Sequence, residues 1–222
     1  MTPPPIRDGN RLVVREDPAS HLLPVFCPDR HIIDNGYFCI YWEEDGSFDV
    51  VDESSAVVWL EILEKFLRLQ QRASYLGHWP SREVWTHGVS AARHQQRAEA
   101  VAAKLDLGWP SLVLEREMRA VLEPGDCIRV YVGQDQLFST WRSPNRFTAE
   151  RKHRVFAVEA AGKHSRRPVS KRRAKLLREL AWDLLNWSFA EKRYWDIQKD
   201  RDCCGTMDTC ELRKRGCNGN KV

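Results

Sequence analysis

The sequence predicts a sharp reversal of the chain at Asp34-Asn35-Gly36. These three residues, which are typical of turns, separate an aliphatic pair at 32–33 from an apolar segment at 38–40. A polar triplet at 29–31 precedes the aliphatic pair. The segment 29–40 is therefore expected to double back on itself, which brings side chains on either side of the turn near each other.

Cys39 and His31 are the candidate reactive residues on the two sides of this turn, eight positions apart. A cysteine thiolate is the strongest side-chain nucleophile for acyl transfer near neutral pH. A nearby histidine can take a proton or stabilise developing negative charge. The alternative interpretation is that Cys39 is a buried strand cysteine, because free cysteine is among the most buried residue types.

This segment resembles the active-site region of ubiquitin-conjugating enzymes. That family carries His-Pro-Asn, two mostly apolar residues, a spacer, Asp/Asn-Gly, one further residue, an apolar residue, the active cysteine and Leu or Ile. In this chain Asp29-Arg30-His31 falls on the triplet, Asn35-Gly36 on the turn and Cys39 on the active cysteine, without a gap. The resemblance covers about residues 22–72 and is greatest to the divergent bacterial members.

The resemblance implies that Cys39 accepts the C-terminal carboxyl of a ubiquitin-like protein from an activating enzyme and passes it to an amine of a target protein. His31 stands where the family has its oxyanion-stabilising Asn, and an imidazole can donate a hydrogen bond or handle a proton. Asp34, Asn35 and Gly36 would shape the turn that exposes the thiol. Such bacterial members typically accompany a ubiquitin-like protein, an activating enzyme and a JAB-type deconjugating metalloprotease in operons linked to phage defence.

The expected fold class is α+β, with a shortened ubiquitin-conjugating core of antiparallel sheet and helices at 1–108. Only 38 residues precede Cys39, whereas a complete family domain needs roughly 65–80 there for a helix and a four-stranded meander. We expect a strand-rich extension with a basic segment and a long helix at 109–200. A Cys-rich tail follows at 201–222.

Hydrophobic spacing predicts the individual elements. Short apolar runs predict strands at 12–14, 22–26, 38–42 and within 112–160. Amphipathic periods predict helices over about 54–72, from 83 or 89 to 106, and over 170–198. The second helix carries a stripe of small residues at 91, 95, 98, 102 and 105, and Gly108 and Pro110 are expected to end it. Residues 133–135 are expected to form a three-residue hairpin loop.

The composition is that of a folded, mildly basic protein. Apolar residues make up 42% and the formal net charge is +4, which excludes wholesale disorder and is too weak to indicate nucleic acid as the partner. No apolar run approaches the roughly 18 residues of a membrane helix, and residues 1–6 lack a signal-peptide pattern, so a cytoplasmic location is expected. The basic run at 166–175 can bind phosphates or an acidic protein surface, or form a solvated helix start.

Four of the seven cysteines lie in the last twenty residues, at Cys203, Cys204, Cys210 and Cys217. Four thiolates can hold a zinc ion, although no Cys-x2-Cys knuckle is present. The alternatives are an unstructured tail, disulfides formed on oxidation, or a docking peptide that orders on a partner. The apolar period stops near Asp200, so core packing is not expected to explain these cysteines. Thioester exchange itself requires no cofactor.

A non-enzymatic function is the second hypothesis. A basic, Trp-rich adaptor with a Cys-rich tail would dock on a protein or on nucleic acid. The segment 77–88, with two Trp and two His, fits a wall of the active site, a partner surface or a packed loop. Neighbouring genes for a ubiquitin-like protein and an activating enzyme would favour the conjugation enzyme over the adaptor.

Overall fold

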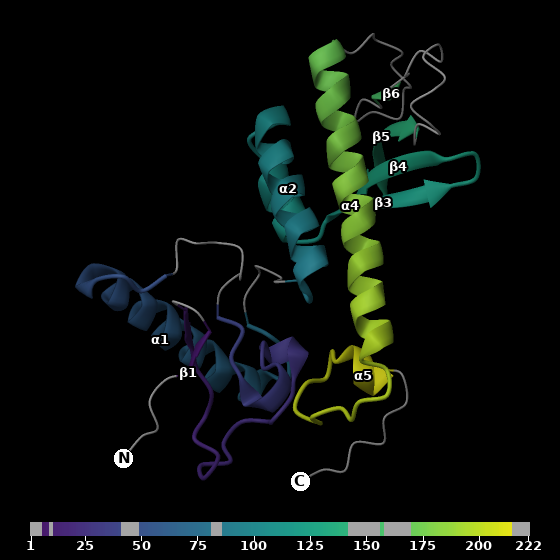
Figure 1. The fold of residues 1–222 in the computed structure, drawn as a ribbon. Coiled ribbons are helices and arrows are strands. Elements are labelled where there is room, and N and C mark those ends of the chain that lie inside the picture. The colour runs from purple at the N-terminus through teal and green to yellow at the C-terminus, as the bar shows by residue number, and fades with distance from the viewer. Residues whose placement is uncertain are drawn as a thin grey trace. The chain divides into compact units, whose positions relative to one another are not determined.

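The computed structural model describes residues 6–8, 11–40, 49–80, 86–141, 156–157 and 170–214 (Figure 1). The chain divides into two compact units, one formed by Met1–Ser81 with Trp195–Val222 and the other by Arg82–Tyr194. Helices and antiparallel strands are both present in the described ranges, which confirms the predicted α+β class.

The two units differ from the domains expected to end at residues 108 and 200. Helix α2 (Val89–Leu105) packs with the strands of the second unit rather than with the segment that carries Cys39. The chain after residue 200 belongs to the first unit, together with residues 1–81. The Cys-rich tail is thus part of the unit that contains the predicted site.

The first unit combines a small hairpin with short and long helices. Strands β1 and β2 pair antiparallel, with Ile6 opposite Val13. The bounds are β1 Ile6–Asp8, β2 Arg11–Val13, η1 Pro28–Arg30, η2 Asp34–Gly36, α1 Glu53–Leu76 and α5 Glu211–Lys214, where η denotes a 3-10 helix.

The strand predicted at 22–26 is wrong, because its backbone donors are taken by a side chain. The N–H groups of Leu22 and Leu23 donate to the carboxylate of Glu16 at 2.7 and 2.8 Å. Pro24 follows them and has no N–H to offer a neighbouring strand. The segment is therefore held as an irregular loop.

Helix α1 has a defined start and a defined end. The Asp52 carboxylate accepts the Ser55 N–H at 2.8 Å, and Ser55 Oγ accepts the Asp52 N–H at 2.9 Å, which is a capping box. Gly77 caps the other end with φ 68°, so the helix runs four residues past the expected end at 72. Its buried face is formed by Trp59, Phe66, Gln70 and Ala73.

The second unit is built on a four-stranded antiparallel sheet whose strands are neighbours in chain order. Asp135 already pairs with Val132, so the expected three-residue loop has only two residues, Gly133 and Gln134. The bounds are β3 Met118–Glu123, β4 Cys127–Val132, β5 Asp135–Trp141 and β6 Phe156–Ala157.

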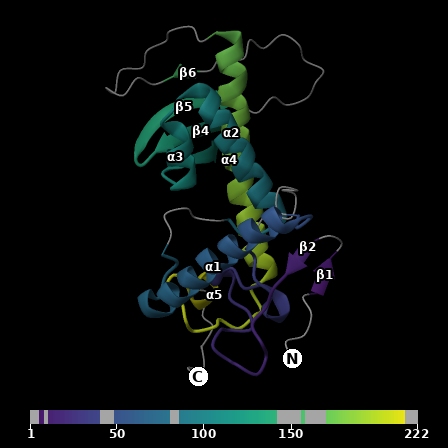
Figure 2. The ribbon, with the colours of Figure 1, turned by 90° about the vertical axis from the view of Figure 1, so that its left-hand side faces the viewer.

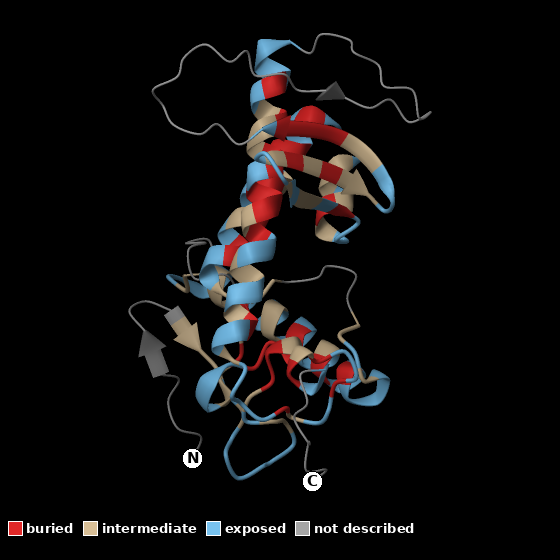
Figure 3. Cartoon of the chain, turned by 90° about the vertical axis from the view of Figure 1, so that its right-hand side faces the viewer, coloured by how far each residue is buried: buried red, intermediate tan, exposed pale blue. Residues whose placement is uncertain are grey.

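Helices α2, α3 (Trp109–Leu114) and α4 (Lys171–Ile197) lie against this sheet (Figure 2). Figure 3 shows in red the buried residues that run along α4 and into the strands. Pro110 lies in the first turn of α3, so it begins a helix where it was expected only to end α2. The predicted small-residue stripe of α2 is buried, with Ala91, Gln95, Ala98, Ala102 and Leu105.

Candidate active site

Cys39 and His31 lie opposite each other in a short antiparallel hairpin. The Cys39 N–H donates to the His31 carbonyl oxygen at 2.8 Å, and Ile32 forms a bridge with Phe38 in the next position. The chain reverses between them at Asp34–Gly36, as the sequence predicts. In place of the strand expected at 38–42, residues 38–39 make this pairing and a hydrogen bond from the Phe38 N–H to the Val14 carbonyl at 2.8 Å, and residues 41–42 lie outside the described ranges.

The turn depends on residues that accept a left-handed backbone. Asn35 has φ 62° and Gly36 has φ 77°. His31 is also left-handed, with φ 53°, and its N–H donates to the Pro28 carbonyl at 2.7 Å to end η1. Asn and His are among the few residue types besides Gly that occupy this region with some frequency. These local geometries set the register that places residue 31 opposite residue 39.

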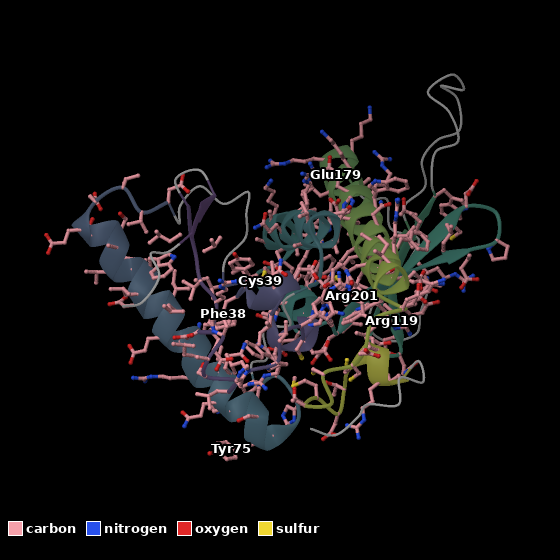
Figure 4. All side chains as sticks on the ribbon, turned by 60° about the horizontal axis from the view of Figure 1, so that its bottom comes forward. Phe38, Cys39, Tyr75, Arg119, Glu179 and Arg201 are labelled. Atoms are coloured by element: carbon pink, nitrogen blue, oxygen red, sulfur yellow. The ribbon has the colours of Figure 1, made fainter. Side chains whose placement is uncertain are left out.

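An aromatic cluster packs against the hairpin. The His31 ring meets the Trp79 indole edge to face at a centroid distance of 4.9 Å, and Trp79 continues to Phe66 at 6.0 Å. Phe66 lies on α1 and contacts Phe38 at 5.1 Å, beside Cys39 (Figure 4). His31 is buried, whereas Cys39 is half-buried. The contact of Trp79 with His31 fits the first of the three interpretations of segment 77–88, and residues 81–85 of that segment lie outside the described ranges.

A buried Arg30–Gln70 pair fixes the triplet on α1. Arg30 is 2% exposed, and its guanidinium donates to the Gln70 side-chain oxygen at 2.8 Å and to the Gln70 carbonyl at 3.0 Å. The Gln70 amide donates back to the Arg30 carbonyl. Sequence reasoning did not single out either residue. The available signal was a Gln on the otherwise apolar face of the helix that carries Trp59 and Phe66.

The tail contacts the turn through Arg201. Its guanidinium forms an ion pair with Asp34 and lies over the Phe26 ring, 4.4 Å from the centroid. Because the Asp34 side chain is 60% exposed, this pair contributes little to stability. Asp34 is therefore linked to the tail as well as to the turn.

Cys27 and Cys204 bring two sulfur atoms together behind the hairpin, with Sγ–Sγ 2.9 Å. The hydrogen bond to Cys204, followed by burial, raises the pKa of the Cys27 thiol. The hydrogen bond to Cys27 lowers the pKa of the half-buried Cys204 thiol to about 6 against the effect of burial. Thr206 and the charge of Arg30 act in the same direction on Cys204. The two shifts have opposite directions, so Cys204 loses its proton more readily than Cys27.

Two of the four tail cysteines are buried in the first unit. We expected core packing to explain none of the four, and for these two that expectation is wrong. Cys203 and Cys210 are 7% and 1% exposed. Burial raises the pKa of Cys210 to about 12. The tail joins α1 where the Asp208 N–H donates to the Gly77 carbonyl at 2.6 Å.

No group of three or more Cys, His, Asp or Glu side chains converges on a metal-sized site within the described ranges. Cys217 lies outside them, so zinc held by Cys203, Cys204, Cys210 and Cys217 stays a prediction. Residues 166–169 of the basic run also lie outside the described ranges, so what they bind stays a prediction. The part of the basic run that is described begins α4, with exposed side chains at 171–173.

Two family models match the chain. A prokaryotic E2 domain covers residues 6–81, and a cysteine-rich domain that follows E2 domains covers residues 86–212, more than half of the chain. The chain belongs to the prokaryotic E2-like family. No curated protein and no solved structure matches it significantly.

The E2 match includes the whole hairpin of this E2-like protein, and therefore both His31 and Cys39. The cysteine-rich match includes three tail cysteines, Cys203, Cys204 and Cys210. In the structure these three belong to the same unit as the E2 segment. None of the helices in the described ranges combines the length and the apolar composition that a membrane span requires.

Proposed function

We propose that this E2-like protein carries a ubiquitin-like protein as a thioester on Cys39 and transfers it to an amine of a target protein. The observation that carries the proposal is the backbone pairing of Cys39 with His31 inside the segment matched by the E2 domain. Cys39 is half-buried, so part of the residue is open to solvent.

Loading is a thioester exchange. The Cys39 thiolate attacks the carbonyl carbon of the modifier's C-terminal thioester on the activating enzyme, and the thiolate of that enzyme leaves. One carbon–sulfur bond forms as another breaks, so the step is close to balanced in energy. It needs an accessible sulfur and no cofactor.

Discharge forms an amide. The target amine attacks the Cys39 thioester, negative charge develops on the carbonyl oxygen, and the Cys39 thiolate leaves while the amine loses a proton. In this proposal the His31 imidazole stabilises the oxyanion by donating a hydrogen bond, or accepts the amine proton. Trp79 limits how the imidazole can turn, and the Arg30–Gln70 pair holds the backbone that carries it.

The proposed partners are a ubiquitin-like modifier, an activating enzyme and a target protein. The proposed setting is a bacterial ubiquitin-like pathway in the cytoplasm with a role against phage. This part of the proposal rests on the family resemblance of the segment around Cys39 and on the prokaryotic E2 match.

The test incubates the purified protein and ATP with a bacterial ubiquitin-like protein and its matching activating enzyme. We expect an adduct that reducing agent removes. Cys39→Ser should give a reducing-agent-resistant oxyester or no adduct. Cys127→Ser changes a half-buried cysteine of the other unit and should leave the adduct unchanged. An adduct that Cys39→Ser does not alter would assign the carrier role to another cysteine.

A further inference from the structure

Cys27 and Cys204 are arranged as a dithiol that can close. They are 177 positions apart in the chain, yet their sulfur atoms are 2.9 Å apart, within about 1 Å of the roughly 2.05 Å of a disulfide bond. We propose that a hydroperoxide converts this pair into a reversible disulfide, which ties the Cys-rich tail covalently to the segment that precedes His31. Neither the thioester chemistry of Cys39 nor the family match assigns this function to the pair.

The two thiols differ in their exposure to solvent, and this difference assigns them different roles in the oxidation. Cys204 is half-buried, so an oxidant can reach it from solvent, and its sulfur contacts Thr206 Oγ1 at 3.1 Å. Cys27 is 1% exposed, so an oxidant in solvent does not meet its sulfur directly. Cys204 is therefore the sulfur that meets the oxidant, and Cys27 is the sulfur that resolves the product.

The atoms and electrons of the reaction balance. The Cys204 thiolate attacks one oxygen of the hydroperoxide and the O–O bond breaks. A sulfenic acid forms, and the alkoxide or hydroxide that leaves takes up the proton that the Cys204 thiol had released to solvent. The Cys27 sulfur then attacks the Cys204 sulfur and displaces the hydroxyl group, which leaves as water with the Cys27 proton. The two thiols lose two electrons and the hydroperoxide gains them. A dithiol reductant returns both thiols by exchange.

The bond would act on the backbone next to the candidate active site. Cys27 exchanges two backbone hydrogen bonds with Ile32, at 2.9 and 3.0 Å, and Ile32 is adjacent to His31. The His31 carbonyl in turn accepts the Cys39 N–H. A covalent link at Cys27 therefore restrains the backbone that sets the position of His31 relative to Cys39. Its effect on acyl transfer rests on the proposed function, whereas the disulfide does not.

A competing pair lies close by. Cys203 and Cys210 are hydrogen-bonded to each other, but both are buried. Oxidation that starts from solvent should therefore select Cys204 over Cys203, although the two are adjacent in sequence. This contrast gives the matched control for the experiment.

The experiment treats the reduced full-length chain with one equivalent of hydrogen peroxide, blocks the remaining thiols with N-ethylmaleimide and digests with trypsin without reductant. Cys27 falls in the tryptic peptide 16–30 and Cys204 in 202–213, which also holds Cys203 and Cys210. We expect the two peptides joined with a loss of about 2 Da, and released by dithiothreitol. Cys204→Ser should abolish the link, and Cys203→Ser should retain it.

The melting temperature is a second readout. It compares the oxidised and reduced wild-type chain, so it does not depend on how well the variants fold. Closing a loop of this length should raise the melting temperature of the oxidised wild-type chain by about 10 °C over the reduced chain. Cys27 found alkylated after oxidation, a link that persists in Cys204→Ser, or a link to Cys203 or Cys210 would overturn the proposal. Zinc found by elemental analysis and retained on these thiols after one equivalent of peroxide would overturn it as well.

The same preparations separate this inference from the proposed function. Reduced Cys204→Ser should still form the Cys39 adduct with the modifier. If the disulfide forms in the wild-type chain while no adduct forms at Cys39, the proposed function fails and the disulfide stands. If the adduct forms and the disulfide does not, the proposed function stands and the disulfide proposal fails.

Discussion

The amide of Cys39 donates a hydrogen bond of 2.8 Å to the carbonyl oxygen of His31. An eight-residue separation in the sequence thereby becomes a pair of opposed positions in one hairpin. The two backbone positions are held by the turn between them and by the left-handed conformations at His31, Asn35 and Gly36.

The buried Arg30 should depend on the Gln70 side chain. Gln70→Ala removes the acceptor for Arg30 Nε and the donor to the Arg30 carbonyl, so we expect a loss of about 2–3 kcal/mol in the free energy of unfolding. Gln71→Ala, at an exposed neighbouring position of α1, should change it by less than about 0.5 kcal/mol. Urea unfolding measures both. Equal effects of the two substitutions would show that the pair does not fix the triplet.

The junction of α1 with the tail should be sensitive to a methyl group at Gly77. Gly77 and Gly205 both have positive φ, so Ala costs about 1–2 kcal/mol at either position. A Cβ at Gly77 would in addition collide with the Asp208 carboxylate, whereas a Cβ at Gly205 meets nothing within 4 Å.

We therefore expect a larger loss of unfolding free energy and faster tryptic cleavage of the tail in Gly77→Ala than in Gly205→Ala. Adding Asp208→Ala to Gly77→Ala should recover the difference. If the two glycine variants are equally stable, Asp208 moves away without cost and the tail is not held at this point.

These contacts show why sequence reasoning captured one part of the site and not the other. The Cys39–His31 hairpin is local, and Asp34-Asn35-Gly36 carries its turn chemistry in the sequence. The Arg30–Gln70 and Cys27–Cys204 contacts join positions 40 and 177 residues apart, which no local pattern encodes.

The errors in the predicted elements also have physical causes. The strand at 22–26 fails because the Glu16 side chain competes for its donors. The tail shows no helical or strand period because it is irregular apart from the four-residue helix α5, yet it buries Met207, Cys210 and Leu212. Hydrophobic periodicity predicts helices and strands, but it does not predict which irregular segments are buried.

Glu191 in the second unit should make stability depend on pH in the acid range. Burial opposes its charge, but the His87 imidazole 3.7 Å away and the hydrogen bonds from Arg116 at 2.7 and 2.5 Å outweigh burial and lower the pKa of Glu191 from 4.5 to about 2. A carboxylate with a depressed pKa in the folded state stabilises the fold above pH 4.5, and this contribution is lost as the pH falls toward 2.

The lowered pKa corresponds to at most about 3 kcal/mol, and we expect less because Arg116 is one-third exposed to solvent. Urea midpoints between pH 5 and pH 2 should fall less steeply in Glu191→Gln than in the wild-type chain. Glu179→Gln, at a more exposed position of α4, should follow the wild-type chain. A Glu191→Gln chain with the wild-type slope would contradict this role.

The central claim is that His31 and Cys39 act together in acyl transfer, and single-turnover kinetics test it most directly. Cys39 is loaded with a bacterial ubiquitin-like modifier by its activating enzyme, that enzyme is quenched, and discharge to an amine is timed. His31→Asn keeps a hydrogen-bond donor and tolerates the left-handed backbone, so it should retain most of the discharge rate.

His31→Ala removes the donor and should slow discharge by roughly 10²–10³-fold, the loss expected for one oxyanion donor, while loading of Cys39 falls much less. Equal losses in loading and discharge, shared by His31→Asn and His31→Ala, would contradict the account and leave His31 with a purely structural role.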